Sequence, residues 1–224
     1  MTTRLIKQFC IASLLAAFPL IAGAAEISSY GSLGTQGVGA GVSIPLTESS
    51  ALRLELNGLS ISKDFTEGSI DYDGQLKNTS IAALYDWHFS PASSFRATAG
   101  LVFNDGGLQA RGTSSASGSY TVGGTTVSVG AGERIDAKAD FRKVSPYIGI
   151  GWSKAAKEKG LSFFGDIGAF YAKPQARLDL TPTLEAAVNA ADPSAIERET
   201  AKVQDRADNL KWYPVLRIGV RYTF

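Results

Sequence analysis

The chain has 224 residues, 24 of them glycine, with a formal net charge of +1 and a mean hydropathy of +0.01. A charge balance so close to neutral excludes a net field that would recruit nucleic acid or anionic lipid. The single cysteine, Cys10, lies in an N-terminal segment that we expect to be removed, so disulfides and thiolate chemistry are excluded from the rest of the chain.

The N-terminus has the pattern of a secretory signal peptide. Arg4 and Lys7 precede an apolar run that ends at Ile21, and small residues follow it. We therefore expect residues 1–24 to be cleaved and residues 25–224 to form one barrel domain, whose formal charge is −1 because two cations are lost (+1 − 2). No later segment approaches the roughly 20 apolar residues of a spanning helix, so any membrane crossing requires strands closed into a barrel.

Apolar and polar side chains alternate along most of the remaining chain, which is the period of a β-strand. The third strand changes its apolar phase after Asn57-Gly58, which predicts a β-bulge. The fold class predicted is all-β: an antiparallel up-and-down transmembrane β-barrel of eight strands, with ten as the alternative. The strands are expected at residues 26–33, 38–46, 52–61, 81–89, 95–103, 140–152, 161–171 and 211–224.

The connections alternate between long and short. Segment 105–138 is rich in glycine and serine, and it contains two short alternating stretches around Gly123-Gly124 that predict a hairpin. In segment 173–208, Ser194 and Glu197 have the spacing of a capping box, followed by apolar residues at helical spacing, so a short amphipathic helix is expected. If the C-terminus is periplasmic, the long connections at 34–37, 63–71, 105–138 and 173–208 lie outside, and the short turns at 47–50, 90–94 and 153–160 face the periplasm.

The last strand shows the two faces most clearly. Every even residue from Trp212 to Phe224 is apolar, whereas Arg217 and Arg221 lie on the odd face. Aromatic residues at both ends of an apolar face are typical of a strand that crosses a bilayer, whereas a soluble lipocalin-like barrel would turn its apolar face inward. The membrane-facing aromatic residues are expected to be Tyr85, Trp87, Phe89, Phe95, Phe103, Trp152 and Trp212.

The chain resembles the small Gram-negative outer-membrane β-barrels grouped as OmpW-like and opacity-type porins. The resemblance covers the whole mature chain and rests on Asp86-Trp87-His88-Phe89, residues 145–152, Trp212-Tyr213-Pro214 and the terminal residues 221–224. It implies an outer-membrane location, with Tyr222 and Phe224 as the C-terminal signal that the barrel-assembly machinery reads after periplasmic chaperones deliver the chain. No catalytic or ligand-binding residue carries over, and the length of segment 105–138 departs from the simplest eight-stranded barrels.

Charged residues of both signs share the inward parity. Because an isolated buried charge is costly, we expect them to pair, with Glu55, Asp86 and Asp166 as partners for Arg217 and Arg221. Eight strands leave an interior just wide enough for side chains, which favours a filled lumen over a thin polar path for solutes. The predicted lumen charge network is Arg53, Glu55, Asp86, His88, Arg96, Asp166, Arg217 and Arg221.

Two patterns suggest chemistry and are better explained by structure. Asp86, His88 and Ser90 share one parity, but side chains two apart on a strand stand roughly 6.5–7 Å apart, too far for a hydrogen-bonded catalytic relay. The acidic residues of 64–73 could attract calcium, yet their spacing matches no EF-hand loop. We therefore expect no catalytic residue, no metal site and no cofactor.

Two classes of function remain open on this basis. The barrel could be a narrow porin-like channel for small solutes, or largely structural; alternatively, its long outer connections could bind a surface ligand or serve adhesion. A lipid-modifying enzyme is a distant third. The partners expected are outer-membrane lipid and the assembly factors, and not nucleic acid, because Arg198, Lys202 and Arg206 are interspersed with acidic residues.

Overall fold

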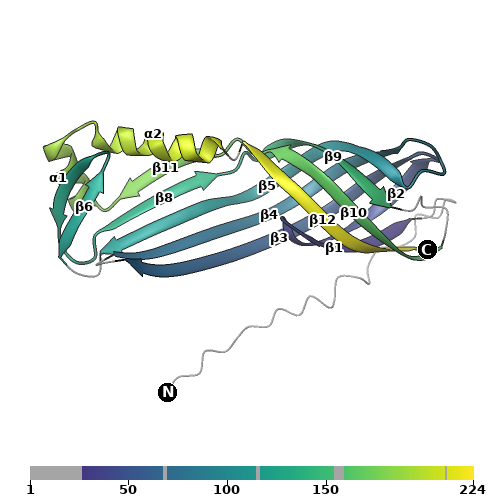
Figure 1. Ribbon diagram of the computed structural model, residues 1–224, viewed down its shortest axis with the longest axis horizontal. Helices are drawn as coiled ribbons and strands as arrows, with labels where there is room; N and C mark the ends of the chain where they lie inside the picture. Colours follow the sequence, from purple (N-terminus) through teal and green to yellow (C-terminus); the bar gives the residue numbers. More distant parts are fainter. Residues whose placement is uncertain (1–26, 68–69, 115–116, 154–158, 210) are drawn as a thin grey trace, which may run out of the picture.

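The computed structural model describes residues 27–67, 70–114, 117–153, 159–209 and 211–224. The expected signal peptide, residues 1–24, lies outside the described residues. The described chain forms an elongated barrel that continues at one end into a helix-covered sheet, with the C-terminus at the opposite end (Figure 1). No helix in these ranges is long and apolar enough to cross a membrane.

Eight antiparallel strands close into a ring, which confirms the predicted strand number. Each strand pairs with its neighbours in the order β1-β2-β3-β4-β5-β9-β10-β12, and β12 pairs back onto β1 to close the ring. These strands are β1 (Ser28–Gly34), β2 (Gly37–Thr47), β3 (Ser50–Glu67), β4 (Ile70–His88), β5 (Phe95–Ser114), β9 (Val144–Ser153), β10 (Gly160–Tyr171) and β12 (Trp212–Thr223).

Three of the ring strands, β3, β4 and β5, run well beyond the ring and form the base of what we call the extension. Above the ring, β5 pairs with β8 (Arg134–Asp140), and β8 pairs with β11 (Gln175–Leu180). The hairpin β6 (Gly118–Val122) and β7 (Thr125–Val129) and the helices α1 (Pro182–Ala191) and α2 (Ala195–Asp208) complete it. The ten strands of the main sheet are therefore eight in the ring and two, β8 and β11, in the extension.

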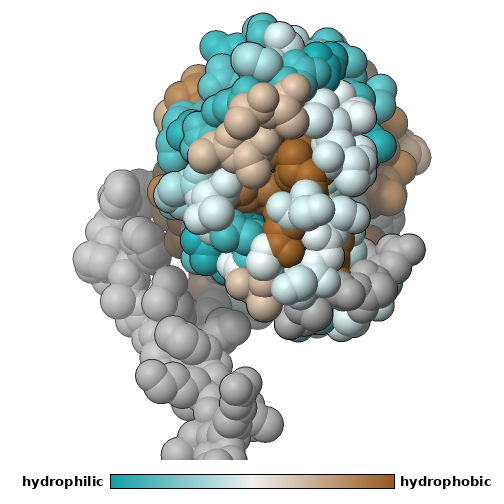
Figure 2. Space-filling view, turned by 90° about the vertical axis from the view of Figure 1, so that its left-hand side faces the viewer, coloured by the Kyte–Doolittle hydropathy of each residue, from teal (hydrophilic) through white to brown (hydrophobic). Residues whose placement is uncertain are grey.

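The extension has its own apolar core. Tyr120 and Val122 of the hairpin pack with Leu184 and Val188 of α1, and Ala195 of α2 joins them. Seen from its free end, the extension shows apolar side chains at the centre surrounded by hydrophilic ones (Figure 2). The long connections are therefore folded structure and not open loops.

The polarity of the two faces of the wall reverses between ring and extension. In the ring, Leu54 is exposed on the outside, whereas Arg53 and Glu55 are buried in the lumen. Above the ring, the register places Leu76 opposite Leu108 on the inner face and Gln75 opposite Gln109 on the outer face. The wall is thus apolar outward where it meets lipid and apolar inward where it covers the extension's core.

This reversal corrects the predicted bulge. The β3–β4 register is continuous through Asn57 and Gly58, and the irregularity in β3 pairing lies instead between Pro45 and Thr47 of β2. Gly58 pairs with Val38 at the start of β2, so β3 has no β2 partner beyond this point and leaves the ring. The apolar phase changes because the environment of the strand changes, while its backbone stays regular.

Several connections contain more structure than expected. Segment 63–71 belongs mostly to β3 and β4, and the predicted strand at 140–152 begins only at Val144, because Asp140 ends β8. Strands β8 and β11 and helix α1 were not predicted. The hairpin at Gly123-Gly124 is confirmed, and the positive φ values of both glycines, 57° and 89°, are those that a two-residue type I′ turn requires.

The predicted amphipathic helix is confirmed as α2, but the capping box is wrong. Ser194 makes no side-chain cap; its backbone N–H donates to Oδ1 of Asp192 at 2.9 Å. Arg198 donates to the same carboxylate at 2.5 Å, and these two contacts hold the pKa of Asp192 below its usual value. Asp192 lies two residues before Ser194, so its carboxylate forms a local turn with the backbone immediately before the helix.

The polarity reversal can be tested on a single strand. Replacing Leu54 with Arg puts a charge on the lipid-facing side of the ring and should cost about 2–4 kcal/mol if the site lies near the bilayer midplane. Replacing Ser62 with Arg puts the same charge on the same face of β3 above the ring, where water should accept it at a cost within about 0.5 kcal/mol. Unfolding free energies measured in lipid vesicles by tryptophan fluorescence should differ accordingly. Equal costs would contradict the reversal.

Candidate functional site

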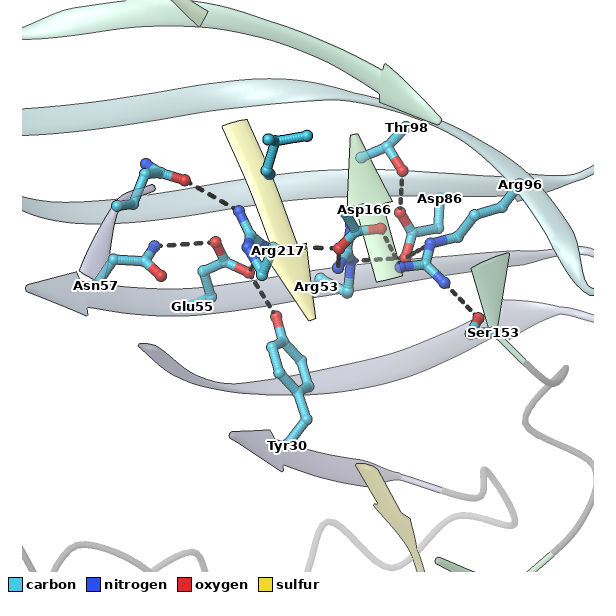
Figure 3. Close-up of polar contacts among 12 residues, drawn as sticks. Tyr30, Arg53, Glu55, Asn57, Asp86, Arg96, Thr98, Ser153, Asp166 and Arg217 are labelled. Atoms are coloured by element: carbon cyan, nitrogen blue, oxygen red, sulfur yellow. Dashed lines mark hydrogen bonds and ion pairs between the residues drawn. The ribbon is translucent and has the colours of Figure 1, made fainter. Parts of the chain in front are cut away.

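The centre of the lumen holds a closed square of charges from four strands (Figure 3). Arg53 of β3 contacts Asp86 of β4 at 2.7 Å and Asp166 of β10 at 2.9 Å. Arg96 of β5 contacts the same two carboxylates, with 3.4 Å to Asp86. All four side chains are buried. Each guanidinium therefore faces two carboxylates and each carboxylate two guanidiniums, the arrangement that best offsets the cost of removing them from water.

Two hydroxyl groups complete the square. Thr98 donates to Oδ1 of Asp86 at 2.7 Å, and Arg96 donates to the hydroxyl of Ser153. Gly151 lies against the charge square, since a Cβ at that position would collide with Asp166 and press on Arg96. The absence of a side chain at Gly151 gives the square its room.

A second cluster continues the network toward the extension. Arg217 of β12 pairs with Glu55 of β3, which also accepts hydrogen bonds from Tyr30 and Asn57, both at 2.9 Å. Arg217 also donates to Gln36 in the β1–β2 turn at 3.0 Å. Its distance to Asp166 is 3.8 Å, which links this cluster to the square.

Arg221 and His88 differ from the other predicted network residues. Both are buried at the C-terminal end of the lumen, but neither has an ion pair among the described residues. The guanidinium of Arg221 lies 5.7 Å from the centre of the Phe164 ring, a cation–π contact. The expected pairing of Arg221 with a carboxylate is therefore wrong, because the three lumen carboxylates are already used by Arg53, Arg96 and Arg217.

An apolar layer fills the lumen on the extension side of the charges. Phe170 stacks on Tyr213 at 4.9 Å between ring centres, and Phe141 meets Tyr213 edge-on at 5.8 Å. Leu84 and Val215 close the space around them, and all but Tyr213 are buried. Sequence reasoning missed this layer, although Phe170 shares the parity of Asp166 and could have been assigned inward on that signal. Together, the charges and this layer occupy the cross-section of the ring.

The predicted lipid-facing aromatic residues all lie exposed on the outside of the ring. Trp87 meets Phe89 near the short turns, and Tyr171 meets Trp212 at the opposite end, each pair edge-to-face. The exposed set comprises Tyr85, Trp87, Phe89, Phe95, Phe103, Trp152 and Trp212, together with Tyr222 and Phe224 of the C-terminal strand. Aromatic residues at both ends of an apolar band are typical of the two interfaces of a bilayer.

The structure does not assemble a catalytic relay from Asp86, His88 and Ser90. The carboxylate of Asp86 is occupied by Arg53, Arg96 and Thr98, and no hydrogen bond among the described residues joins it to His88. Within the same part of the chain, no group of three or more potential metal ligands comes together. What the lumen can do chemically is hold charge, and its groups are arranged to neutralise one another.

Two solved structures share this architecture. The crystal structure of Acinetobacter baumannii CarO matches with a TM-score of 0.57 and 24% sequence identity, over 89% of this chain and 98% of that one. The structure of A. baumannii CarO2 matches with a TM-score of 0.60 and 20% identity, over the same shares of the two chains. No protein-family model matches the chain, and no curated protein matches it. The likeness shows a shared fold, with the extension included in the matched length.

A double-mutant cycle tests the charge square. Replacing Asp166 with Asn leaves buried guanidiniums without a full partner and should cost about 3–5 kcal/mol of unfolding free energy. Replacing Arg53 with Met should have a cost of similar size. The two changes together should cost less than their sum by at least about 1 kcal/mol, because neither leaves the other's charge unpaired. Additive costs in vesicle unfolding experiments would show that the square is not an energetic unit.

Proposed function

We propose that this protein is an integral barrel of a Gram-negative outer membrane, with a sealed lumen and a folded extension held outside the cell as its interaction surface. The observation that carries this proposal is the filling of the ring's cross-section by the charge square and the apolar layer behind it. Arg53, Arg96, Leu84 and Phe170 each expose less than 1% of their surface. Opening a passage would require breaking paired buried charges, which costs several kcal/mol per pair.

The lengths of the connections support the proposed orientation. The turns near the C-terminus are short, as is typical of the periplasmic side, and the long connections build the extension at the opposite end. Tyr222 and Phe224 remain accessible on the outside of β12, where the barrel-assembly machinery could read them after export with cleavage of residues 1–24. Outer-membrane lipid would surround the apolar band.

A second candidate function is a narrow path for small solutes. A polar chain runs from Glu55 through Arg217 to Gln36, which lies at the rim of the ring next to the extension. Displacement of the β1–β2 turn, whose Thr35 carbonyl accepts a hydrogen bond from Tyr213 at 2.7 Å, would connect the charges to the outer rim. An enzymatic role has no assembled relay to support it, so we propose no catalytic residue and no cofactor.

Conductance in planar bilayers separates the two candidates. A sealed lumen predicts no stepwise current from folded protein at about 100 mV, under conditions in which a general porin conducts. A polar path predicts discrete steps, which replacement of Gln36 with Trp should reduce, whereas replacement of Thr121 with Trp on the exposed hairpin should not. Steps that respond to the Gln36 variant alone would overturn the sealed-lumen proposal.

Chemical labelling tests the orientation. The chain after residue 24 contains no cysteine, so single cysteines can be introduced without background. Cysteine at Lys202, on the exposed side of α2, should react with a membrane-impermeant maleimide on intact cells. Cysteine at Ala92, in the short turn between β4 and β5, should react only after the outer membrane is permeabilised. The reverse pattern would place the extension in the periplasm.

A further inference from the structure

The wall contains a basic pocket where the sheet forks. In the ring β5 pairs with β9, and above the ring it pairs with β8, so the two partners separate beside residues 104–107. Backbone bonds hold both sides of the fork: Asn104 N–H donates to Lys143 O, and Phe141 N–H donates to Gly106 O. A pocket of about 750 Å³ lies here. Its cations are Lys77, Lys138, Arg142, Lys143, Lys173 and Arg177, against two carboxylates, Asp105 and Asp140.

The pocket opens on the outer face of the wall, directly beyond the lipid-facing surface. Lys77 lies opposite Gly107, and Gly107 lies opposite Asp140, so their side chains share one face of the sheet. Ile81 lies four residues beyond Lys77 along β4, on the same face, where it is exposed and pairs with Phe103. Four residues span roughly 13 Å along a strand, or about 10 Å along the axis of a tilted barrel. The pocket is therefore at headgroup level when the apolar band is in the bilayer.

The pocket has more cationic side chains than carboxylates to pair with them. Lys143 pairs with Asp105 at 2.9 Å, and Arg177 lies 3.7 Å from Asp140. Lys77, Arg142 and Lys173 are exposed and have no ion pair among the residues that the structure describes. The pocket therefore has a local excess of positive charge, whereas the chain as a whole is close to neutral.

We propose that this pocket binds the phosphorylated sugar headgroup of an outer-leaflet glycolipid. The inference rests on the proposed orientation in the outer membrane. Lysine and arginine side chains recognise phosphate through charge-assisted hydrogen bonds, and basic pockets at the membrane surface bind lipid headgroups. A lipid is favoured over a free anion because Phe103 and its cross-strand neighbour Val144 are exposed on the same side and provide an apolar surface for acyl chains. One lipid molecule can therefore place its phosphates in the basic pocket and its acyl chains against this apolar surface.

Binding of bisphosphorylated lipid A to the purified full-length mature barrel, measured by native mass spectrometry, tests the proposal. The parent protein should bind this lipid at least about tenfold more tightly than the same lipid with its phosphates removed. The variant K77Q/R142Q/K173Q removes the three unpaired cations and should weaken binding on the order of 100-fold, since each cation near the membrane surface contributes about 1 kcal/mol.

The matched control is K63Q/K202Q/R206Q, which removes three exposed cations from the extension outside the pocket and should bind as the parent does. Heat-modifiable gel mobility establishes that each variant is folded. Equal binding by parent and pocket variant, equal loss in the control, or equal binding of both lipids would overturn the proposal. Displacement of the lipid by an equal concentration of inorganic phosphate would also overturn it, in favour of a free-anion site. These outcomes differ from failure of the sealed-lumen proposal, which conductance reports.

Discussion

The structure depends on one constraint: a β-strand cannot change the alternation of its side chains, but the media on its two sides change along its length. Strands β3, β4 and β5 pass from the lipid-facing ring into the extension without a bulge between β3 and β4. Their outer face must be apolar below the boundary and polar above it, and their inner face the opposite. The sequence meets this demand by reversing its own pattern, as in the change from Leu54 and Leu56 outward to Leu76 and Leu108 inward.

Filling the lumen with charge follows from the same constraint. An apolar exterior leaves the inward positions to polar groups, and in a ring of eight strands these groups touch one another and not bulk water. Pairing of opposite charges offsets the cost of burying them, and in the square each guanidinium lies within ion-pair distance of both carboxylates. Arg221 is the exception, and it lies at the end of the lumen, where Phe164 provides a ring face in place of a carboxylate.

Sequence parity was sufficient for the ring and for the direction of most lumen charges, because both depend on local alternation. It could not assign partners: which carboxylate meets Arg217 depends on the stagger between β3 and β12, which no local pattern encodes. The extension was largely missed for a related reason. The inner face of β8 carries one large apolar residue, Ile135, and otherwise alanines, Ala137 and Ala139, so its alternating pattern is weak. Its partner β5 also lies far from it in the sequence. Helix α1 did carry a readable signal, since Pro182 follows Thr181 at its first position.

The fork in the sheet joins the apolar layer that fills the lumen to the basic pocket on the outer face. Residues 141–143 connect β8 to β9 at the level where the polarity reverses, and their side chains divide between the two sides of the wall. Phe141 turns inward and packs against Tyr213 in the apolar layer, whereas Arg142 and Lys143 line the basic pocket outside. The Arg142 N–H donates to Ala172 O, which fixes this segment to the connection that carries Lys173. The seal of the lumen and the charge at the headgroup level are thus positioned by the same short segment, so a change in the backbone there would move both.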